Sequence, residues 1–376
     1  MAIRVTPLNQ RRWQLFRQNK RGFLSFWLFM VLFLISVFAP FIANDRPVLV
    51  SYKGEWLYPT FVDYPESKFG GFLARTDFRD PVNQEEIQAN GWMVWPLIRY
   101  SYNTVNNELP MPAPSTPAFQ LTREQACVKY PLGVNDPNCV FGNLNWLGTD
   151  DQGRDVLSSI MYGTRLSLIV SLAAVAVAMV LGISLGLISG YFGGAIDAVI
   201  MRVADVQLTF PAILVALLID GVVRGLISVK RHDEIAIFVV VGAIGLSFWV
   251  SYARTVRGSV MVEKNKEYVQ AARVIGLSPL LIMVRHVLPN VTGPVLVIAT
   301  LNLGLAIITE ATLSFLGVGL PSTEPSLGTL IRLGNEVLQS GDWWITVFPG
   351  VTLAALVLAV NLLGDWLRDA LNPKLR

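Results

Sequence analysis

Uncharged, apolar stretches recur along the whole chain and are long enough to cross a membrane. A helix needs about 20 apolar residues to span the hydrocarbon core of a bilayer. The sequence predicts six such spans, at approximately residues 22–42, 166–187, 208–219, 235–252, 291–312 and 343–363. The third has the shortest uncharged core, so we extend it to about 206–223 and accept Asp220 near one end.

The composition agrees with a membrane protein. Of the 376 residues, 53% are hydrophobic and only 15% are charged, which is more apolar than a soluble protein of this size tolerates. A net charge of +3 is too small to indicate a nucleic-acid partner. We therefore predict an all-α integral membrane protein.

The distribution of basic residues predicts the orientation of the spans. Cytoplasmic segments near spans are enriched in Lys and Arg. The basic residues before the first span are Arg4, Arg11, Arg12, Arg17, Lys20 and Arg21, and those of the segment 251–290 are Arg254, Arg257, Lys264, Lys266, Arg273 and Arg285. Both segments are predicted to be cytoplasmic. Arg224, Lys230 and Arg231 would lie outside, as an exception beside acidic neighbours.

This topology divides the chain into four parts. Residues 1–21 form a basic cytoplasmic N-terminus, 22–42 the first transmembrane helix, 43–165 a periplasmic insertion, and 166–376 a five-helix core with a cytoplasmic loop at 257–290. We expect the insertion to be a compact subdomain with one stiff, proline-rich linker at 110–117.

The insertion holds both cysteines of the chain, Cys127 and Cys139. In an oxidising compartment, a disulfide closing this short loop is the natural interpretation, and it would stabilise the fold by about 3 kcal/mol in the chain-entropy model. The alternative is two free buried thiols. A metal site is not expected, because the only histidines, His232 and His286, are far away in sequence.

The cytoplasmic segment 263–290 has the pattern of a helix, a turn and a second helix. Gly276 is suited to the left-handed residue that ends the first helix, and Ser278 with Pro279 form a preferred start for the second. Pro289 is predicted to end the second helix. By helical spacing, one face combines small and apolar side chains, namely those of Tyr268, Ala271, Ala272 and Ile275, and would let a partner protein approach closely.

The spacing of this segment resembles the EAA loop of ABC importer permeases. The family's pattern is matched by Gln270-Ala271-Ala272, then Gly276, then Leu288-Pro289. Gln270 stands in place of the family's Glu, and His286 in place of its Ile. The resemblance implies that the loop is a coupling helix that docks in a cleft of an ATPase subunit. The residues expected to take part are Tyr268, Gln270, Ala271, Ala272, Ile275, Gly276, Leu288 and Pro289. The alternative is an ordinary amphipathic hairpin.

A second motif, rich in polar and turn-forming residues, precedes the second span. Its members are Gly148, Thr149, Asp150, Gly153, Arg154 and Asp155. The glycines permit tight turns, Asp155 can cap the following helix, and Arg154 or Arg165 can pair with a neighbouring carboxylate. We favour a structural collar at the mouth of the pore over direct binding of substrate.

This second motif resembles the C-type permeases of the dipeptide, oligopeptide and nickel importer family, as do residues 190–194 and 313–317. Within that family the N-terminus and the long insertion look most like the Yej-type branch. The resemblance implies the type I ABC importer (MetI-like) fold of six helices, and import of oligopeptides or peptide antibiotics such as microcin C by alternating access. It also implies three partners: a second permease, an ATPase with two nucleotide-binding domains, and a periplasmic peptide-binding protein.

No phosphate-binding loop or catalytic set is evident in the chain, so ATP and magnesium are expected on the partner ATPase and no cofactor on this subunit. Nickel or another small solute is the alternative substrate, and a secondary transporter is the rival class. Glu310, in the fifth span, either lines the pathway or lies near the membrane surface or in a hydrogen bond to a neighbouring helix. Gly182 and Gly186 suit close helix packing, within the chain or against the partner permease.

Overall fold

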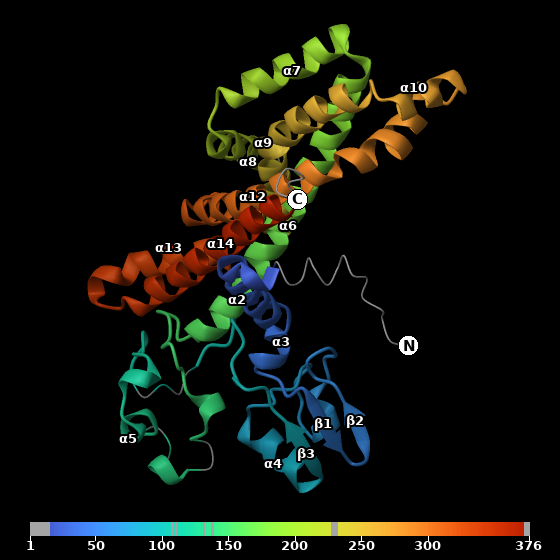
Figure 1. The fold of residues 1–376 in the computed structure, drawn as a ribbon. Helices are drawn as coiled ribbons and strands as arrows, with labels where there is room; N and C mark the ends of the chain where they lie inside the picture. Colours follow the sequence, from blue (N-terminus) through green and yellow to red (C-terminus); the bar gives the residue numbers. More distant parts are fainter. Residues whose placement is uncertain are drawn as a thin grey trace. The chain divides into compact units, whose positions relative to one another are not determined.

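A computed structural model describes residues 16–106, 109, 111–128, 130, 132–136, 139–226 and 232–371. The chain forms two compact units. Unit 1 takes in the described residues of Met1–Met30, Ser167–Pro321 and Leu353–Arg376, and unit 2 consists of those of Val31–Leu166 and Ser322–Thr352. Figure 1 follows the chain through both, and each unit is described by itself below.

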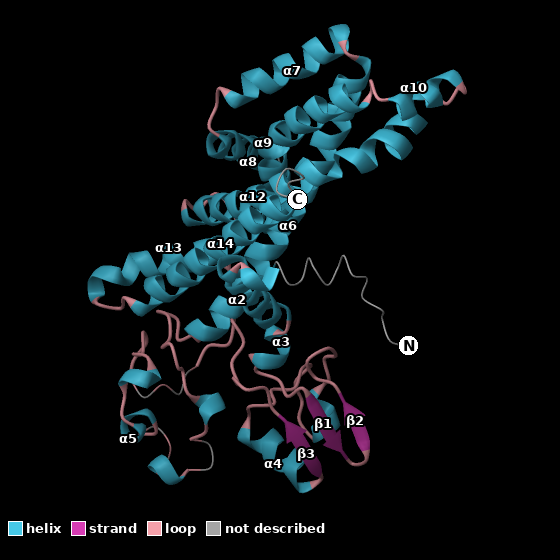
Figure 2. Ribbon diagram, in the orientation of Figure 1, coloured by secondary structure: helices cyan, strands magenta, loops and turns pink. Residues whose placement is uncertain are grey.

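Five helices of the described chain are long and apolar enough to cross a membrane. They are α2 (Lys20–Val37), α6 (Val156–Phe192), α9 (His232–Glu263), the helix that ends as α12 (Leu288–Phe315), and α14 (Trp344–Leu371). A bent pair, α7 (Gly194–Leu208) and α8 (Ala212–Leu226), makes a sixth span if the two are counted as one. The helical architecture expected for the membrane part is therefore confirmed (Figure 2).

The third span differs from its prediction. The interval 206–223 is not one continuous helix, because α7 and α8 meet there at a bend of 95°. Pro211 lies in the break, and a proline both lacks an N–H and disfavours helical backbone in the residue before it. Hydropathy alone does not report this bend, because the residues on both sides are apolar.

A stripe of glycines brings α6 and α9 into backbone contact within unit 1. Cβ atoms added at Gly182, Gly186 and Gly190 would lie 2.4 Å from Tyr252 Cβ, 2.6 Å from the carbonyl oxygen of Ala253 and 2.8 Å from Val260 Cβ. Spacing by four residues places the three glycines on one face of α6. The expected close packing at Gly182 and Gly186 is thus confirmed within this chain.

The insertion in unit 2 contains a small antiparallel sheet that the sequence analysis did not predict. Its strands are β1 (Leu49–Tyr52), β2 (Glu55–Leu57) and β3 (Gly91–Val94), in the order β2-β1-β3. Helix α4 (Pro81–Ala89) packs on β3 (Figure 2). Side chains from strands, helix and loops form one core, consisting of Val50, Tyr52, Leu57, Phe69, Phe78 and Ile87.

Unit 2 also holds three short helices. Helix α3 (Ala39–Ile42) follows α2, and α5 (Arg123–Ala126) begins with a capping box between Thr122 and Gln125. Helix α13 (Leu327–Val337) lies between the last two spans and begins with a capping box between Ser326 and Thr329. Its Leu327 and Leu330 are buried, which makes α13 a structural part of unit 2.

The glycine stripe makes a stability prediction. The Gly186→Ala substitution forces a methyl group into the Ala253 carbonyl and Val256, so we expect the free energy of unfolding to fall by about 1–3 kcal/mol. Thermal unfolding of the purified chain in detergent measures this. The matched control is Gly258→Ala on α9, where no atom lies within 4 Å of the new methyl group and helix propensity favours alanine by about 1 kcal/mol. Equal midpoints for the two variants would contradict the prediction.

Candidate functional site

The cytoplasmic loop predicted from the sequence is a helical hairpin in unit 1. Helix α10 (Glu267–Val274) is followed by a turn at Gly276, which has a φ of +85°. Ser278 then caps α11 (Pro279–Leu281), accepting a hydrogen bond from the Leu281 N–H at 3.4 Å, and Pro279 occupies the first turn. The predicted turn between two helices is confirmed, including the left-handed glycine and the Ser-Pro start.

The prediction that Pro289 ends the second helix is wrong. From Pro279 the chain remains helical to Phe315, passing through a π-helical segment at Ile282–Val287 before α12. A proline ring clashes with the carbonyl four residues earlier and removes one hydrogen bond. The wider π turn directly before Pro289 accommodates both defects, so the second arm of the hairpin and the fifth span are one helix.

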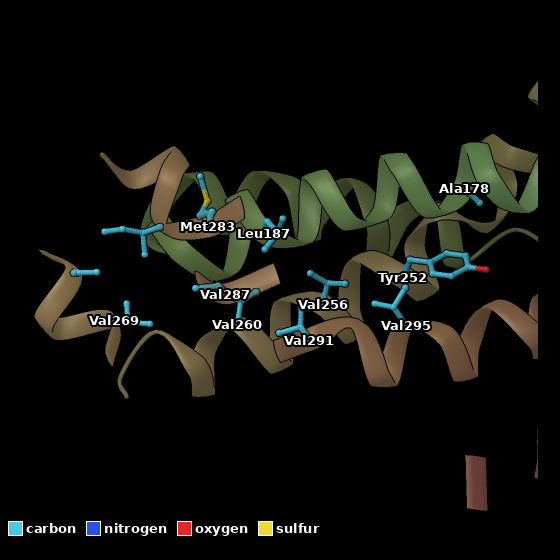
Figure 3. Packing of buried hydrophobic residues seen from close by; sticks show 12 residues of the cluster. Ala178, Leu187, Tyr252, Val256, Val260, Val269, Met283, Val287, Val291 and Val295 are labelled. Atoms are coloured by element: carbon cyan, nitrogen blue, oxygen red, sulfur yellow. The ribbon is translucent and has the colours of Figure 1, made fainter. Parts of the chain in front are cut away.

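The inner face of the hairpin is fixed to the spans. Val269 and Ala272 of α10 lie in a buried cluster with Val260 of α9 and with Met283 and Val287 of the π-helical segment (Figure 3). The Tyr268 hydroxyl donates to Glu263 Oε2 at 2.6 Å and accepts from Asn290 Nδ2 at 3.1 Å. Burial and the bond to Glu263 raise the pKa of Tyr268 to about 12, so the phenol remains a donor at neutral pH.

The predicted docking face divides between the two sides of the hairpin. Ala272 is only 4% exposed and Tyr268 is half-buried, so the expectation that they share an exposed face with Ala271 and Ile275 is wrong. The reason is that α10 carries two apolar stripes. The stripe that contains Val269 packs into the buried cluster, and Ala272 is buried with it. The outer apolar residues are Ala271, Val274, Ile275 and Leu280, which we call the apolar tip.

Three members of the apolar tip are large and open to solvent in this chain. Val274 is 89% exposed, Ile275 76% and Leu280 68%. Val274 and Leu280 were not singled out from the sequence, although their position on either side of the Gly276 turn was available as a signal. Of the other predicted coupling residues, Gln270 and Pro289 are exposed, while Leu288 is half-buried and packs against the cluster of Figure 3.

Basic residues of and directly after α9 bind α7 and α6. Arg257 of α9 binds Asp197 of α7 through two hydrogen bonds of 2.5 and 2.6 Å, and Arg254 pairs with Asp205. Lys264 Nζ donates to the carbonyl oxygen of Gly190 at 2.7 Å. These basic residues therefore join helices as well as giving the segment its positive charge.

Arg224, an exception to the expected charge distribution, has local partners in unit 1. Its Nε lies 2.7 Å from Asp220 Oδ2, and its Nη2 donates to the carbonyl oxygens of Val318 and Gly319. This arginine therefore fixes α8 to the loop after α12. Lys230 and Arg231 lie outside the described residues.

The polar motif before the second span folds as a set of tight turns in unit 2. Gly148 and Gly153 both have a φ of +79°, in the region that favours glycine. Asp150 accepts from the backbone N–H of Gln152 and Arg154 and pairs with Arg154 Nε at 2.7 Å. Burial raises the pKa of Asp150, against the opposing effect of Arg154.

Asp155 caps the start of α6, as predicted. Its Oδ2 accepts from the Ser158 N–H and Oγ, both at 2.8 Å, and its Oδ1 accepts from Asn145 at 2.9 Å. The side chain is 1% exposed, and this burial raises its pKa although the hydrogen bonds favour the carboxylate.

Thr149 connects the same turns to other parts of unit 2. It exchanges hydrogen bonds with Ser115, and its carbonyl oxygen accepts from Trp344 Nε1 of α14 at 3.1 Å. The structure thus brings together the residues of the motif, and turn and capping bonds account for their polar groups. The residues are Gly148, Thr149, Asp150, Gly153, Arg154 and Asp155. We call this group the collar.

Two further predicted sites are placed by the structure. Glu310 of α12 has no exposed surface in this chain, and its Oε1 accepts from Ser314 Oγ at 2.9 Å, one turn along the same helix. Its role in a pathway stays a prediction. Cys127, directly after α5, forms a disulfide with Cys139, with their Cα atoms 5.7 Å apart.

Comparison with known proteins identifies the family. Residues 182–376 match the model of the binding-protein-dependent transport system inner membrane component, and residues 6–64 match the N-terminal TM domain of oligopeptide transport permease C. The chain belongs to the family of binding-protein-dependent inner membrane transport components. It is therefore one component of an ABC importer in a bacterial inner membrane, which works with an ATPase and a substrate-binding protein.

Curated relatives of this ABC permease match along nearly its whole length. The peptidoglycan transport system permease protein YejE of Agrobacterium fabrum is 42% identical over 98% of this chain and 94% of its own length. The inner membrane ABC transporter permease protein YejE of Escherichia coli is 35% identical over 98% of both chains. A solved structure of the MetNI methionine ABC transporter in inward-facing conformations matches 57% of this chain and 96% of that chain, with 18% identity and a TM-score of 0.45.

The buried cap of α6 in this permease makes a pH prediction. The raised pKa of Asp155 means that the folded state binds a proton more readily than the unfolded state. The stability of the wild type relative to Asp155→Asn should therefore increase as the pH falls through that raised pKa towards the ordinary value of 3.8.

Thermal unfolding of the two proteins in detergent across this pH range measures the difference. Asp155→Ala, which removes the cap, should lower stability at every pH by about 1 kcal/mol. If the difference in stability between the wild type and Asp155→Asn were the same at all pH values, the raised pKa of Asp155 would be contradicted.

Proposed function

We propose that this chain is the permease subunit through which an ATP-driven importer moves peptides across the bacterial inner membrane. The relatives named for their substrates support this class: one is named for peptidoglycan transport and another, DppC of Haemophilus influenzae, for dipeptide transport, at 40% identity over 61% of this chain. Oligopeptides, peptidoglycan fragments and peptide antibiotics such as microcin C share the amide backbone. The substrate is therefore a peptide, moved by alternating access.

The apolar tip is the observation that carries the coupling part of the proposal. Val274, Ile275 and Leu280 expose large apolar side chains at the end of a hairpin whose inner face is locked onto α9 and the fifth span. An exposed apolar patch on a rigid support is suited to docking in a groove of a partner protein. In this proposal the tip enters a cleft of the ATPase, and Gly276 shapes the turn.

Two observations support the orientation that coupling requires. The hairpin carries Lys264, Lys266, Arg273 and Arg285, and basic residues are enriched on the cytoplasmic side of membranes. The disulfide between Cys127 and Cys139 favours an oxidising compartment for the insertion. The N- and C-termini are then cytoplasmic and residues 43–165 are periplasmic, with the collar at the outer mouth of the pore.

The remaining subunits follow from this role. The ATPase, with two nucleotide-binding domains, binds ATP and magnesium and performs the hydrolysis, while this subunit carries no catalytic site of its own. A second permease completes the pathway, and a periplasmic protein delivers the peptide. Nickel remains the alternative cargo; among the described residues no group of three His, Cys, Asp or Glu side chains is arranged to hold a metal ion.

Charged substitutions at the apolar tip test the coupling role. Val274→Asp with Ile275→Asp should reduce recovery of the ATPase with this chain after mild detergent extraction by roughly tenfold or more, because each buried apolar side chain contributes about 1.5–3 kcal/mol. Peptide uptake by proteoliposomes should fall in parallel. The thermal midpoint of the isolated chain should not change, since both side chains point to solvent.

Asn265→Asp is the matched control, because it adds a negative charge at an exposed position of the same loop without removing an apolar group. It should leave ATPase recovery unchanged. Ala272→Asp, at a buried position, should instead destabilise the chain itself. Full ATPase recovery by the Val274→Asp, Ile275→Asp variant would overturn the coupling role.

A further inference from the structure

Unit 2 contains an open cleft of about 690 Å³ that has no assigned role. It is bounded by Pro40 of α3 and residues that follow this helix, by residues 75–81 at the start of α4, by residues 101–106 and by Tyr162 of α6. Its volume lies in the range of small-molecule sites, which is roughly 300–1,000 Å³. Its lining carries charges of both signs, from Asp45, Arg46, Arg75, Asp77, Arg79 and Asp80.

Arg79 differs from the other two arginines of the cleft. Arg46 and Arg75 both pair with Asp63, at 2.7 and 3.0 Å. The guanidinium of Arg79 lies over the ring of Tyr100, 4.4 Å from its centre, and forms no ion pair with any residue that the structure describes. A half-buried guanidinium stacked on an aromatic ring is well suited to hold a carboxylate with two parallel hydrogen bonds.

The platform beneath Arg79 is rigid. Tyr100 has no exposed surface, and its hydroxyl donates to the Asn143 carbonyl oxygen at 2.9 Å and accepts from Asn106 at 3.0 Å. Asn106 also donates to Asn145, which in turn donates to Asp155, the cap of α6. The floor of the cleft is therefore part of the same hydrogen-bond network as the collar.

The acidic residues of the cleft are oriented by local bonds. Asp45 accepts from Thr104 Oγ1 at 2.9 Å, Asp77 from the Arg79 N–H at 2.8 Å, and Asp80 from the Val82 N–H at 2.8 Å. They place negative charge in the same cleft as the guanidinium of Arg79. A simple anion would meet repulsion from these groups, whereas a zwitterion satisfies both signs.

We propose that this cleft binds a peptide by its free carboxylate, which Arg79 receives, while the acidic residues favour the ammonium group of the same molecule. The choice of a peptide as ligand rests on the proposed function. The cleft then holds substrate on unit 2 itself, beside the collar and apart from any site on the delivering protein. A rigid guanidinium is ready for this contact without rearrangement.

Binding of a blocked and an unblocked peptide tests the proposal on the unmodified chain. Trialanine and its C-terminal amide are titrated against the full-length chain in detergent, and affinities are measured by ligand-observed NMR. The amide should bind at least roughly tenfold more weakly, because it loses a charge-assisted pair of hydrogen bonds. Acetate should bind more weakly than trialanine, because it lacks the ammonium group.

Variants locate the contact. Arg79→Gln should lower the affinity for trialanine to that for the amide. Arg79→Lys should retain part of the difference in affinity between the two peptides, because the positive charge remains. The control is Arg123→Gln, an exposed arginine at the start of α5 outside the cleft, which should leave both affinities unchanged. The thermal midpoint of each variant in detergent shows that it is folded.

Any one of three results would overturn the inference. They are equal affinities for trialanine and its amide, acetate that binds as tightly as trialanine, and full binding of trialanine by a folded Arg79→Gln variant. Uptake of trialanine by the complete transporter in proteoliposomes is measured as well. It distinguishes failure of the cleft proposal from failure of the proposed function. Uptake without Arg79-dependent binding rejects the cleft alone. Binding without uptake supports the cleft and rejects peptide transport.

Discussion

The close contact between α6 and α9 is the constraint on which unit 1 depends. Gly182, Gly186 and Gly190 leave no side chain between the two helices, so the backbone of α6 lies directly on Ala253 and Val260. In a membrane, helices gain little from hydrophobic burial, and packing of this kind replaces it. The contact continues towards the hairpin, because Val256 and Val260 belong to the same buried cluster as Val269 and Ala272 (Figure 3).

The hairpin extends this packing into a single long element. Since the chain is helical from Pro279 to Phe315, Leu280 of the apolar tip lies on the same helix as the fifth span, whereas Ala271, Val274 and Ile275 lie on the other side of the Gly276 turn. The π-helical segment allows this continuity past Pro289, and it lies where the hairpin enters the buried cluster. A π turn of this type is often found at functional positions in helices.

The part of unit 2 around the collar is organised by polar contacts instead. The collar residues satisfy one another and the start of α6, and the same hydrogen bonds reach Tyr100 beneath the cleft. Polar residues that are fully bonded in this way hold their geometry, because leaving any of them unpaired in a buried site is costly. Rigid turns at this point suit both a structural collar and a preorganised surface for a ligand.

The sequence by itself determined the features that depend on local chemistry. Hydropathy located the continuous spans, Gly276 with Ser278 and Pro279 defined the hairpin turn, and Asp155 was recognisable as a cap, because each follows from the residue and its near neighbours. Tertiary structure decided which of two apolar stripes on α10 is buried, and it placed Ala272 inside and Val274 outside. It also decided the bend at Pro211 and the helical path through Pro289. The small sheet and the stacking of Arg79 on Tyr100 likewise depend on residues distant in sequence, whose packing partners no local pattern specifies.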